Sequence, residues 1–146
     1  MTKPKAVLVD LDNTLALIGD RDPMHGHLCH TDTLCEATAL VLNALTHVEG
    51  LRFVILTGRN ETAREATATW LADRIYFDRL IMRDPSDWRP AAEYKTAMLD
   101  EKVLPYFDVI LALDDDPDVI AAYRERGLVA WQVREPLPES AGAGRE

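Results

Sequence analysis

Five short runs of apolar and β-branched residues recur along the chain, and patterns typical of helices separate them. The runs cover residues 6–9, 53–56, 80–82, 109–113 and 129–133. Apolar runs of this length are typical of strands that are buried on both faces of a parallel sheet. Parallel strands need a crossover, and a helical pattern lies between each run and the next. The sequence therefore predicts an α/β fold with a five-stranded parallel sheet flanked by helices.

Capping residues predict where these helices begin and end. Helices are expected over about residues 32–48, 61–71, 91–103 and 117–127. Thr31 or Asp32 can cap the first, Asn60 the second and Asp116 the fourth, because their side chains can accept a hydrogen bond from the first helical turn. Gly127 is a typical residue for the end of the fourth helix.

The composition is that of one domain with an ordinary hydrophobic core. The chain has 146 residues, of which 47% are hydrophobic, so a core can form without disulfides. The only cysteines, Cys29 and Cys35, argue against a secreted disulfide scaffold. No apolar run approaches the roughly 20 residues that a membrane span needs, so we expect a cytoplasmic protein with no membrane partner. We expect one domain over residues 1–134 and a disordered tail over residues 135–146, which are rich in Pro, Gly, Ala and Glu.

Polar residues follow three of the predicted strands at the point where each strand ends. These segments are Asp10-Leu11-Asp12-Asn13-Thr14, Thr57-Gly58-Arg59 and Asp114-Asp115-Asp116. Each segment alone is weak evidence, because acids after a strand often cap loops or helices and Thr-Gly-Arg is also a plausible turn. Ligands of open α/β sheets, however, bind outside the carboxyl ends of the strands. The shared placement of the three segments therefore predicts one functional site.

The acids of this site predict a bound cation. Asp10 can point at a phosphorus atom while Asp12 lies beside the leaving oxygen, because the chain leaves its strand between them. Packing both beside Asp114 and Asp115 without a cation costs several kcal/mol. An all-oxygen set of ligands fits Mg²⁺.

Three further residues have groups that suit a phosphate. Thr57 offers a hydroxyl and a backbone N–H, and Gly58 lets the backbone come close to a ligand. Lys95 can supply the positive charge that a pentavalent phosphoryl group requires.

These motifs, in this order, resemble those of the haloacid dehalogenase superfamily, whose domain is Rossmann-like. The resemblance implies that Asp10 forms an aspartyl-phosphate. It implies that Asp12 protonates the leaving group and then activates the hydrolytic water, while Thr57 and Lys95 hold the phosphate. Asn13 stands where many members have glycine.

The same resemblance implies the ligands of the metal. Mg²⁺ would be bound by the Asp10 side chain, the Asp12 backbone carbonyl and Asp115, and Asp114 would support them.

A closer resemblance, over most of the chain, is to the 3′-phosphatase domain of phage-type polynucleotide kinase-phosphatases. The segments that carry it include Gly19-Asp20-Arg21-Asp22-Pro23, Leu56-Thr57-Gly58-Arg59, Met82-Arg83, Arg89 ahead of Lys95, Tyr106-Phe107-Asp108-Val109 and Leu113-Asp114-Asp115. It implies that Arg21, Arg59 and Arg83 bind substrate together with Gly58. Two residues depart from the pattern. Ala91 stands where the family has an aspartate four residues before the lysine, and Asp116 replaces an arginine after the acid pair.

The resemblance implies a phosphoric monoester hydrolase that acts as a polynucleotide 3′-phosphatase in nucleic-acid repair. Its substrate would be a 3′-phosphorylated DNA or RNA end, or a nucleotide. No G-x-x-x-x-G-K-[ST] segment occurs in the sequence, so we expect no kinase half. A separate kinase or ligase is one partner that the resemblance allows. The stretches 18–31 and 71–95 are expected to hold loops and no cap domain, which leaves the site open to a bulky polynucleotide end. A net charge of −9 disfavours a broad nucleic-acid surface but is compatible with a local arginine cluster.

Alternatives to this function remain open. The chain can instead be a phosphatase of nucleotides or other small phosphoesters, or a non-catalytic module that binds a phosphate end, which Ala91 alone suggests. Trp88 can stack on a base, although tryptophan is more often a packing residue. Five histidines and cysteines have the residue types of a zinc site, but their spacing matches no standard zinc finger. They are His25, His27, Cys29, His30 and Cys35.

Overall fold

The first apolar run of the sequence forms β1 (Lys5–Val9), the central strand of a parallel sheet. The computed structural model describes residues 2–134, so the tail expected over residues 135–146 lies outside the described residues. The sheet has five strands in the order β5-β4-β1-β6-β7. The other strands are β4 (Arg52–Asn60), β5 (Arg79–Arg83), β6 (Asp108–Asp114) and β7 (Ala130–Gln132). All four strand pairs are parallel, which confirms the fold class predicted from the sequence.

Alternate residues of β1 enter two separate hydrophobic cores, one on each face of the sheet. Val7 and Val9 belong to the first core, and Ala6 and Leu8 belong to the second. This follows from strand geometry, because successive side chains of a strand point to opposite faces. The apolar runs are continuous because both faces are buried.

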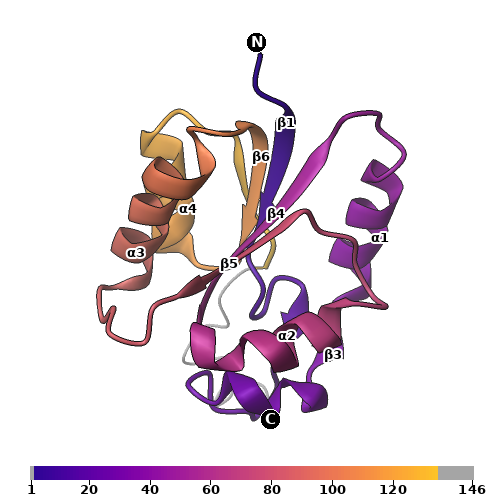
Figure 1. Cartoon of the computed structure of the whole chain (residues 1–146), viewed down its shortest axis with the longest axis vertical. Helices are drawn as coiled ribbons and strands as arrows, with labels where there is room; N and C mark the ends of the chain where they lie inside the picture. The colour runs from indigo at the N-terminus through magenta and orange to yellow at the C-terminus, as the bar shows by residue number, and fades with distance from the viewer. Residues whose placement is uncertain (1, 135–146) are drawn as a thin grey trace, which may run out of the picture.

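Four α-helices cover the two faces of the sheet. They are α1 (Glu36–Leu45), α2 (Arg64–Leu71), α3 (Ala91–Met98) and α4 (Pro117–Glu125). The first core contains buried residues of α1 and α2, and the second contains buried residues of α3 and α4. Figure 1 shows α3 and α4 together on one side of the sheet and α1 on the other.

Two of the predicted helix caps are confirmed. The Asn60 side chain accepts a hydrogen bond from the backbone N–H of Thr62, at the start of a 3-10 turn, η2 (Glu61–Ala63), that leads into α2. The Asp116 side chain accepts one from the backbone N–H of Asp118 at the start of α4. The third predicted helix continues from α3 through a π-helical turn, η3 (Leu99–Val103), as far as expected.

The predicted start of the first helix, at Thr31 or Asp32, is wrong. A 3-10 segment, η1 (Gly26–Thr31), ends there, and α1 begins four residues after Asp32, at Glu36. Between them, β3 (Thr33–Leu34) pairs antiparallel with β2 (Ala16–Leu17), two short strands that the sequence did not predict. The physical reason is the Asp32 side chain, which accepts hydrogen bonds from two arginines and not from a helical N–H.

The stretches that follow β1 and α2 hold loops and short turns, so within residues 2–134 no cap domain covers the sheet edge. The order of the strands reverses beside β1, because the chain adds β4 and β5 on one side and then β6 and β7 on the other. The carboxyl ends of β4, β1 and β6 therefore meet at the position where α/β folds bind ligands. None of the helices described is long and apolar enough to cross a membrane.

Candidate active site

Asp10 lies at the carboxyl end of β1, where the chain turns sharply out of the sheet. Its backbone N–H donates to the carbonyl of Leu113 at 2.9 Å, which keeps it in register with β6. The carbonyl of Leu11 then accepts hydrogen bonds from the N–H groups of residues 15 and 16 at 2.9 and 2.8 Å. Asn13 has φ of 62°, in the left-handed region that asparagine tolerates better than most residues other than glycine. This backbone explains why asparagine can replace glycine here.

The Asp10 carboxylate is buried, and both of its oxygens are held. Thr14 donates its hydroxyl to Oδ2 at 2.8 Å, and Lys95 donates from Nζ to Oδ1 at 2.7 Å. Lys95 also donates to Oδ2 of Asp114 at 2.6 Å. Burial alone would lower the pKa of Lys95, but the charges of Asp10 and Asp114 outweigh it and raise that pKa well above its usual value. Lys95 is therefore a buried cation fixed between two acids.

Asp10, Asp114 and Asp115 form a cluster of carboxylates that fits a hard cation. Each offers one oxygen, and these oxygens all lie within 4.8 Å of one another. Burial, followed by the charge of Asp10, raises the pKa of both Asp114 and Asp115. Three carboxylates at this distance repel one another, and a divalent cation bound to oxygen ligands relieves the repulsion. The donor set therefore fits Mg²⁺.

Two arginines hold the Asp12 side chain. Its Oδ1 accepts from Nε of Arg59 at 2.8 Å and from Nη2 of Arg21 at 3.3 Å. Burial raises the pKa of Asp12 above its ordinary value, and the charge of Arg59 opposes this rise without cancelling it. Among residues 2–134, every side-chain hydrogen bond to Asp12 goes to Oδ1, and the side chain stays 22% exposed. The second oxygen, Oδ2, is therefore available to a substrate.

Asp32 is the functional residue that sequence reasoning missed. Its side chain is fully buried and accepts from Arg21 at 2.7 and 3.0 Å and from Arg59 at 2.7 Å. Its backbone carbonyl accepts from the Trp70 indole at 3.2 Å, which ties this segment to α2. The sequence offered one indirect signal, since buried arginines require an acidic partner, but nothing near Asp32 in the sequence identified it as that partner.

Thr57 lies at the same edge of the sheet as Asp10, near the end of β4, and is 1% exposed. Its hydroxyl oxygen accepts from the backbone N–H of Arg59 at 3.1 Å, and its carbonyl accepts from the Tyr94 hydroxyl at 3.1 Å. These bonds fix the turn while leaving the hydroxyl proton of Thr57 for a ligand. Gly58 is exposed, and a Cβ there would meet only Nη2 of Arg83 at 3.9 Å, so a ligand can approach its backbone.

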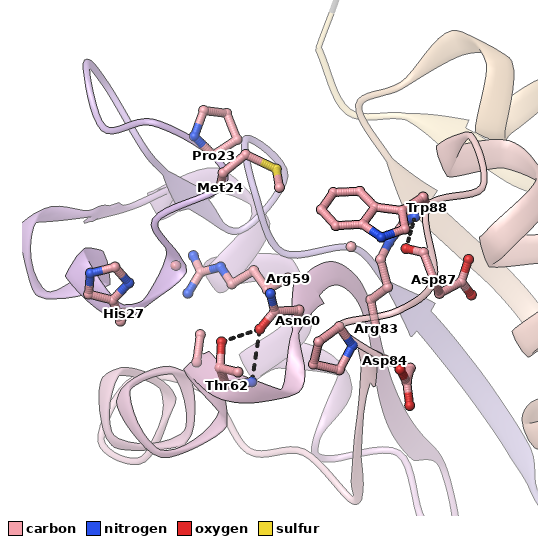
Figure 2. Close-up of a pocket in the computed structure, with 14 residues that line it drawn as sticks. Pro23, Met24, His27, Arg59, Asn60, Thr62, Arg83, Asp84, Asp87 and Trp88 are labelled. Atoms are coloured by element: carbon pink, nitrogen blue, oxygen red, sulfur yellow. Dashed lines mark hydrogen bonds between the residues drawn. The ribbon is translucent and has the colours of Figure 1, made fainter.

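A cleft of about 230 Å³ opens beside this turn, and Figure 2 shows the residues that line it. Gly58, Arg59 and Asn60 line it from β4, and Arg83 lines it from the end of β5. Arg83 lies over the Tyr94 ring, with its guanidinium carbon 4.2 Å from the ring centroid. Its Nη1 donates to the carbonyls of Asp87 and Arg89 at 3.1 and 2.7 Å. Arg83 thus lines the same cleft as Arg59, but its guanidinium binds loop carbonyls and not Asp12.

The structure brings most of the predicted site residues together, although their roles stay predictions. Contacts join Asp10, Lys95, Asp114 and Asp115, and a second set joins Asp12, Arg21 and Arg59. That Arg21 and Arg59 bind substrate stays a prediction, and in the structure their buried side chains bind Asp12 and Asp32. Within the part of the chain described, no group of three or more histidines, cysteines or acids other than the aspartate cluster is arranged to bind a metal, which leaves the zinc alternative without support.

Comparison with known proteins places the chain among phosphatase domains. A sequence model of the family described as the polynucleotide kinase PNKP phosphatase domain matches residues 4–136. A chain from the structure of a Pnkp1/Rnl/Hen1 complex is 35% identical, with a TM-score of 0.86 over 90% of this chain and 46% of that chain. A second, from the structure of the Pnkp1/Rnl/Hen1 RNA repair complex, is also 35% identical, with a TM-score of 0.85 over 90% of this chain and 42% of that one. The chain therefore spans less than half the length of these relatives.

A more distant match shows the same fold. A haloacid dehalogenase family enzyme from Bacteroides thetaiotaomicron, solved with magnesium and inorganic phosphate, is 11% identical with a TM-score of 0.51, over 91% of this chain and 96% of that one.

Proposed function

Because the chain belongs to the family of polynucleotide kinase PNKP phosphatase domains, within the haloacid dehalogenase superfamily, we propose that it removes 3′-phosphates from DNA or RNA ends through an aspartyl-phosphate intermediate. The observation that carries the proposal is the Asp10 carboxylate, buried and held at both oxygens next to a second acid, Asp12. The family supports phosphoester chemistry in general, and the site geometry supports the particular mechanism.

Asp10 is the nucleophile of this mechanism. One of its oxygens attacks phosphorus, so a new bond forms from Asp10 to phosphorus while the bond from phosphorus to the ester oxygen breaks. The hydrogen bonds from Thr14 and Lys95 hold the carboxylate in one orientation, which lowers the entropic part of the barrier. The hydroxyl and the backbone N–H of Thr57 donate hydrogen bonds to the phosphoryl oxygens.

Asp12 is the general acid and then the general base. Its raised pKa favours a protonated fraction, and Oδ2 can give that proton to the departing ester oxygen. In the second step the same oxygen accepts a proton from the water that attacks phosphorus, which breaks the acyl phosphate and restores Asp10. Arg21 and Arg59 act as positioning residues, because they fix Oδ1 and so aim Oδ2 at the ester.

We further propose that Mg²⁺ is the cofactor and that Asp10, Asp115 and the Asp12 backbone carbonyl hold it, with Asp114 in support. When bound, the cation offsets the negative charge of the carboxylates and of the phosphate. The Lys95 ammonium group donates to both Asp10 and Asp114 and partly neutralises their charge, so the cluster also contains one cation from the chain itself.

The absence of a cap domain over the described sheet edge supports a bulky substrate such as a polynucleotide end. The relatives in the Pnkp1/Rnl/Hen1 complexes support nucleic-acid repair as the setting, and a separate ligase or kinase as a partner. The proposed substrates, DNA or RNA, share the 3′-phosphate that the site binds.

Steady-state kinetics on three phosphomonoesters test the proposal. We expect kcat/KM for a 3′-phosphorylated oligonucleotide to exceed that for a nucleoside 3′-monophosphate and for p-nitrophenyl phosphate. Turnover of the oligonucleotide should also fall with added salt, because phosphates next to the end contribute to binding. A preference for the mononucleotide with no salt dependence would instead identify a small-molecule phosphatase.

A further inference from the structure

Two large apolar side chains are exposed on opposite sides of the cleft beside Gly58. Trp88 is 77% exposed and lies on the loop between β5 and α3, and Met24 is 65% exposed and lies on the loop before η1. Figure 2 shows the Trp88 indole and the Met24 thioether facing each other across the opening. Large apolar side chains such as tryptophan and methionine tend to be buried, so an exposed pair that lines one cleft indicates a binding surface.

The loop that carries Trp88 is held by its own hydrogen bonds. Asp84 accepts from the N–H and hydroxyl of Ser86 at 2.8 and 2.6 Å. Asp87 accepts from the backbone N–H of Arg89 at 3.1 Å and from its guanidinium at 2.7 Å. Arg83 crosses the loop to the carbonyls on either side of Trp88. A tryptophan on a braced loop is already oriented, which reduces the entropic cost of binding a ligand against it.

The opposite wall is held in a similar way. The Asp22 side chain accepts from the backbone N–H of Met24 at 2.9 Å. Arg21, one residue earlier, donates to the Asp22 carbonyl at 3.3 Å and is itself fixed on Asp32. The flexible Met24 side chain can therefore adapt to a ligand while its backbone stays in place.

The cleft lies beside the candidate active site. Gly58 and Arg59 line the cleft, and they directly follow Thr57, the residue proposed to bind the phosphoryl group. Arg59 also contacts Asp12, the proposed general acid. A group attached to the leaving oxygen would thus extend from the reaction centre into this cleft.

The formal charges that line the cleft balance, because two acids, Asp84 and Asp87, are matched by two arginines, Arg59 and Arg83, so no net positive charge favours a second phosphate. Hydrogen bonding from Arg89 lowers the pKa of Asp87 to about 2, so this carboxylate is ionised at neutral pH. A cleft of about 230 Å³ lies below the usual range for drug-sized ligands and suits a single flat ring system.

We propose that this cleft binds the base of the terminal nucleotide that carries the 3′-phosphate, with the base stacked on Trp88 and covered by Met24. The inference rests on the proposed 3′-phosphatase function and specifies how its substrate is held. A stacked aromatic ring contacts the flat face that every base has, so the site selects nucleotide ends over sugar phosphates but does not select a base sequence.

The test compares two oligonucleotides that differ only in the terminal base. Both carry a 3′-phosphate, but in one the last nucleotide is abasic. We expect the wild-type protein to have a kcat/KM about tenfold or more higher for the end that bears a base, which is the size of effect that base–aromatic stacking produces. In Trp88→Ala this ratio should fall to about one, and in Trp88→Phe most of it should remain.

Trp131→Ala is the matched control, because Trp131 is also exposed, at 56%, but lies on β7 and does not line the cleft. It should keep the wild-type ratio. Equal turnover of both ends by the wild type would overturn the inference while leaving the 3′-phosphatase function intact. An unchanged ratio in Trp88→Ala would also overturn it. If the wild type hydrolyses p-nitrophenyl phosphate but neither oligonucleotide, the proposed function itself fails, and the inference with it.

Discussion

Replacing Asp32 by asparagine tests whether a buried ion network supports the candidate active site. Asp32 has no exposed side-chain surface, and its two arginine partners are 0% and 3% exposed. The substitution keeps the size and shape of the side chain but removes the negative charge between Arg21 and Arg59. One of the new amide N–H groups would also face a guanidinium donor, so at least one of the three short contacts is lost.

The expected loss of stability is large for a single substitution. Removing one partner of a buried ion pair costs about 3–5 kcal/mol, because the remaining charges are left without compensation in a dry environment. Asp12 can offset only part of this, since its Oδ1 already contacts both arginines. For a domain of this size the loss corresponds to a fall in Tm of roughly 12–20 °C.

Thermal unfolding of Asp32→Asn and of a matched variant, Asp100→Asn, measures the effect. Asp100 also accepts two hydrogen bonds from an arginine, Arg126, at 2.8 and 3.0 Å, but the Arg126 and Asp100 side chains are 37% and 48% exposed. Exposed ion pairs contribute little to stability, so the control should melt close to the wild type.

Activity provides the second measurement in this experiment. At a temperature where Asp32→Asn is still folded, kcat should fall by about 10- to 100-fold, because the two arginines that aim Asp12 lose their support. If Asp32→Asn and Asp100→Asn melt at the same temperature, the buried network does not stabilise the fold as argued. A destabilised variant with wild-type kcat would remove Arg21 and Arg59 from the positioning of Asp12.

Three further predictions concern the chemistry of the site. Asp10→Asn should reduce turnover to a few per cent or less while the circular dichroism spectrum stays unchanged, because an amide cannot form the acyl phosphate. Activity should vanish in EDTA and return with Mg²⁺. Full turnover in the chelator would exclude a metal from the mechanism, and recovery with Zn²⁺ alone would contradict the magnesium site. Arg83→Ala should lower kcat/KM about tenfold or more for a 3′-phosphorylated oligonucleotide but only weakly for p-nitrophenyl phosphate, since one charge-assisted contact to the nucleotide end is lost, and equal losses on both would mean general phosphate binding.

The sheet and the placement of the chemical groups could be read from the sequence because both depend on short-range patterns. Five apolar runs predicted five parallel strands, and each of the strands was found. The polar segments at the carboxyl ends of β1, β4 and β6 had to meet at one edge, because parallel strands end on the same side. For the same reason Asp10 and Asp114 could be expected together although they are far apart in the chain.

What the sequence did not indicate depends on which loops meet in space. Thr31 and Asp32 have the composition of a helix cap, and only the folded chain shows Asp32 between two arginines, one of them 27 residues away. Tertiary contacts outweigh the local capping preference here, because leaving a buried guanidinium without an acid costs more free energy than losing one helix cap.

The cleft between Met24 and Trp88 was decided by tertiary structure alone. Its walls come from two loops that are separated along the chain by every element from η1 to β5, and each loop is braced by hydrogen bonds of its own. Sequence patterns report the period with which a segment buries its apolar residues, which identifies strands and helices. They carry no information about the distance between two exposed side chains on different loops, since that distance is set by the packing of all the elements between them.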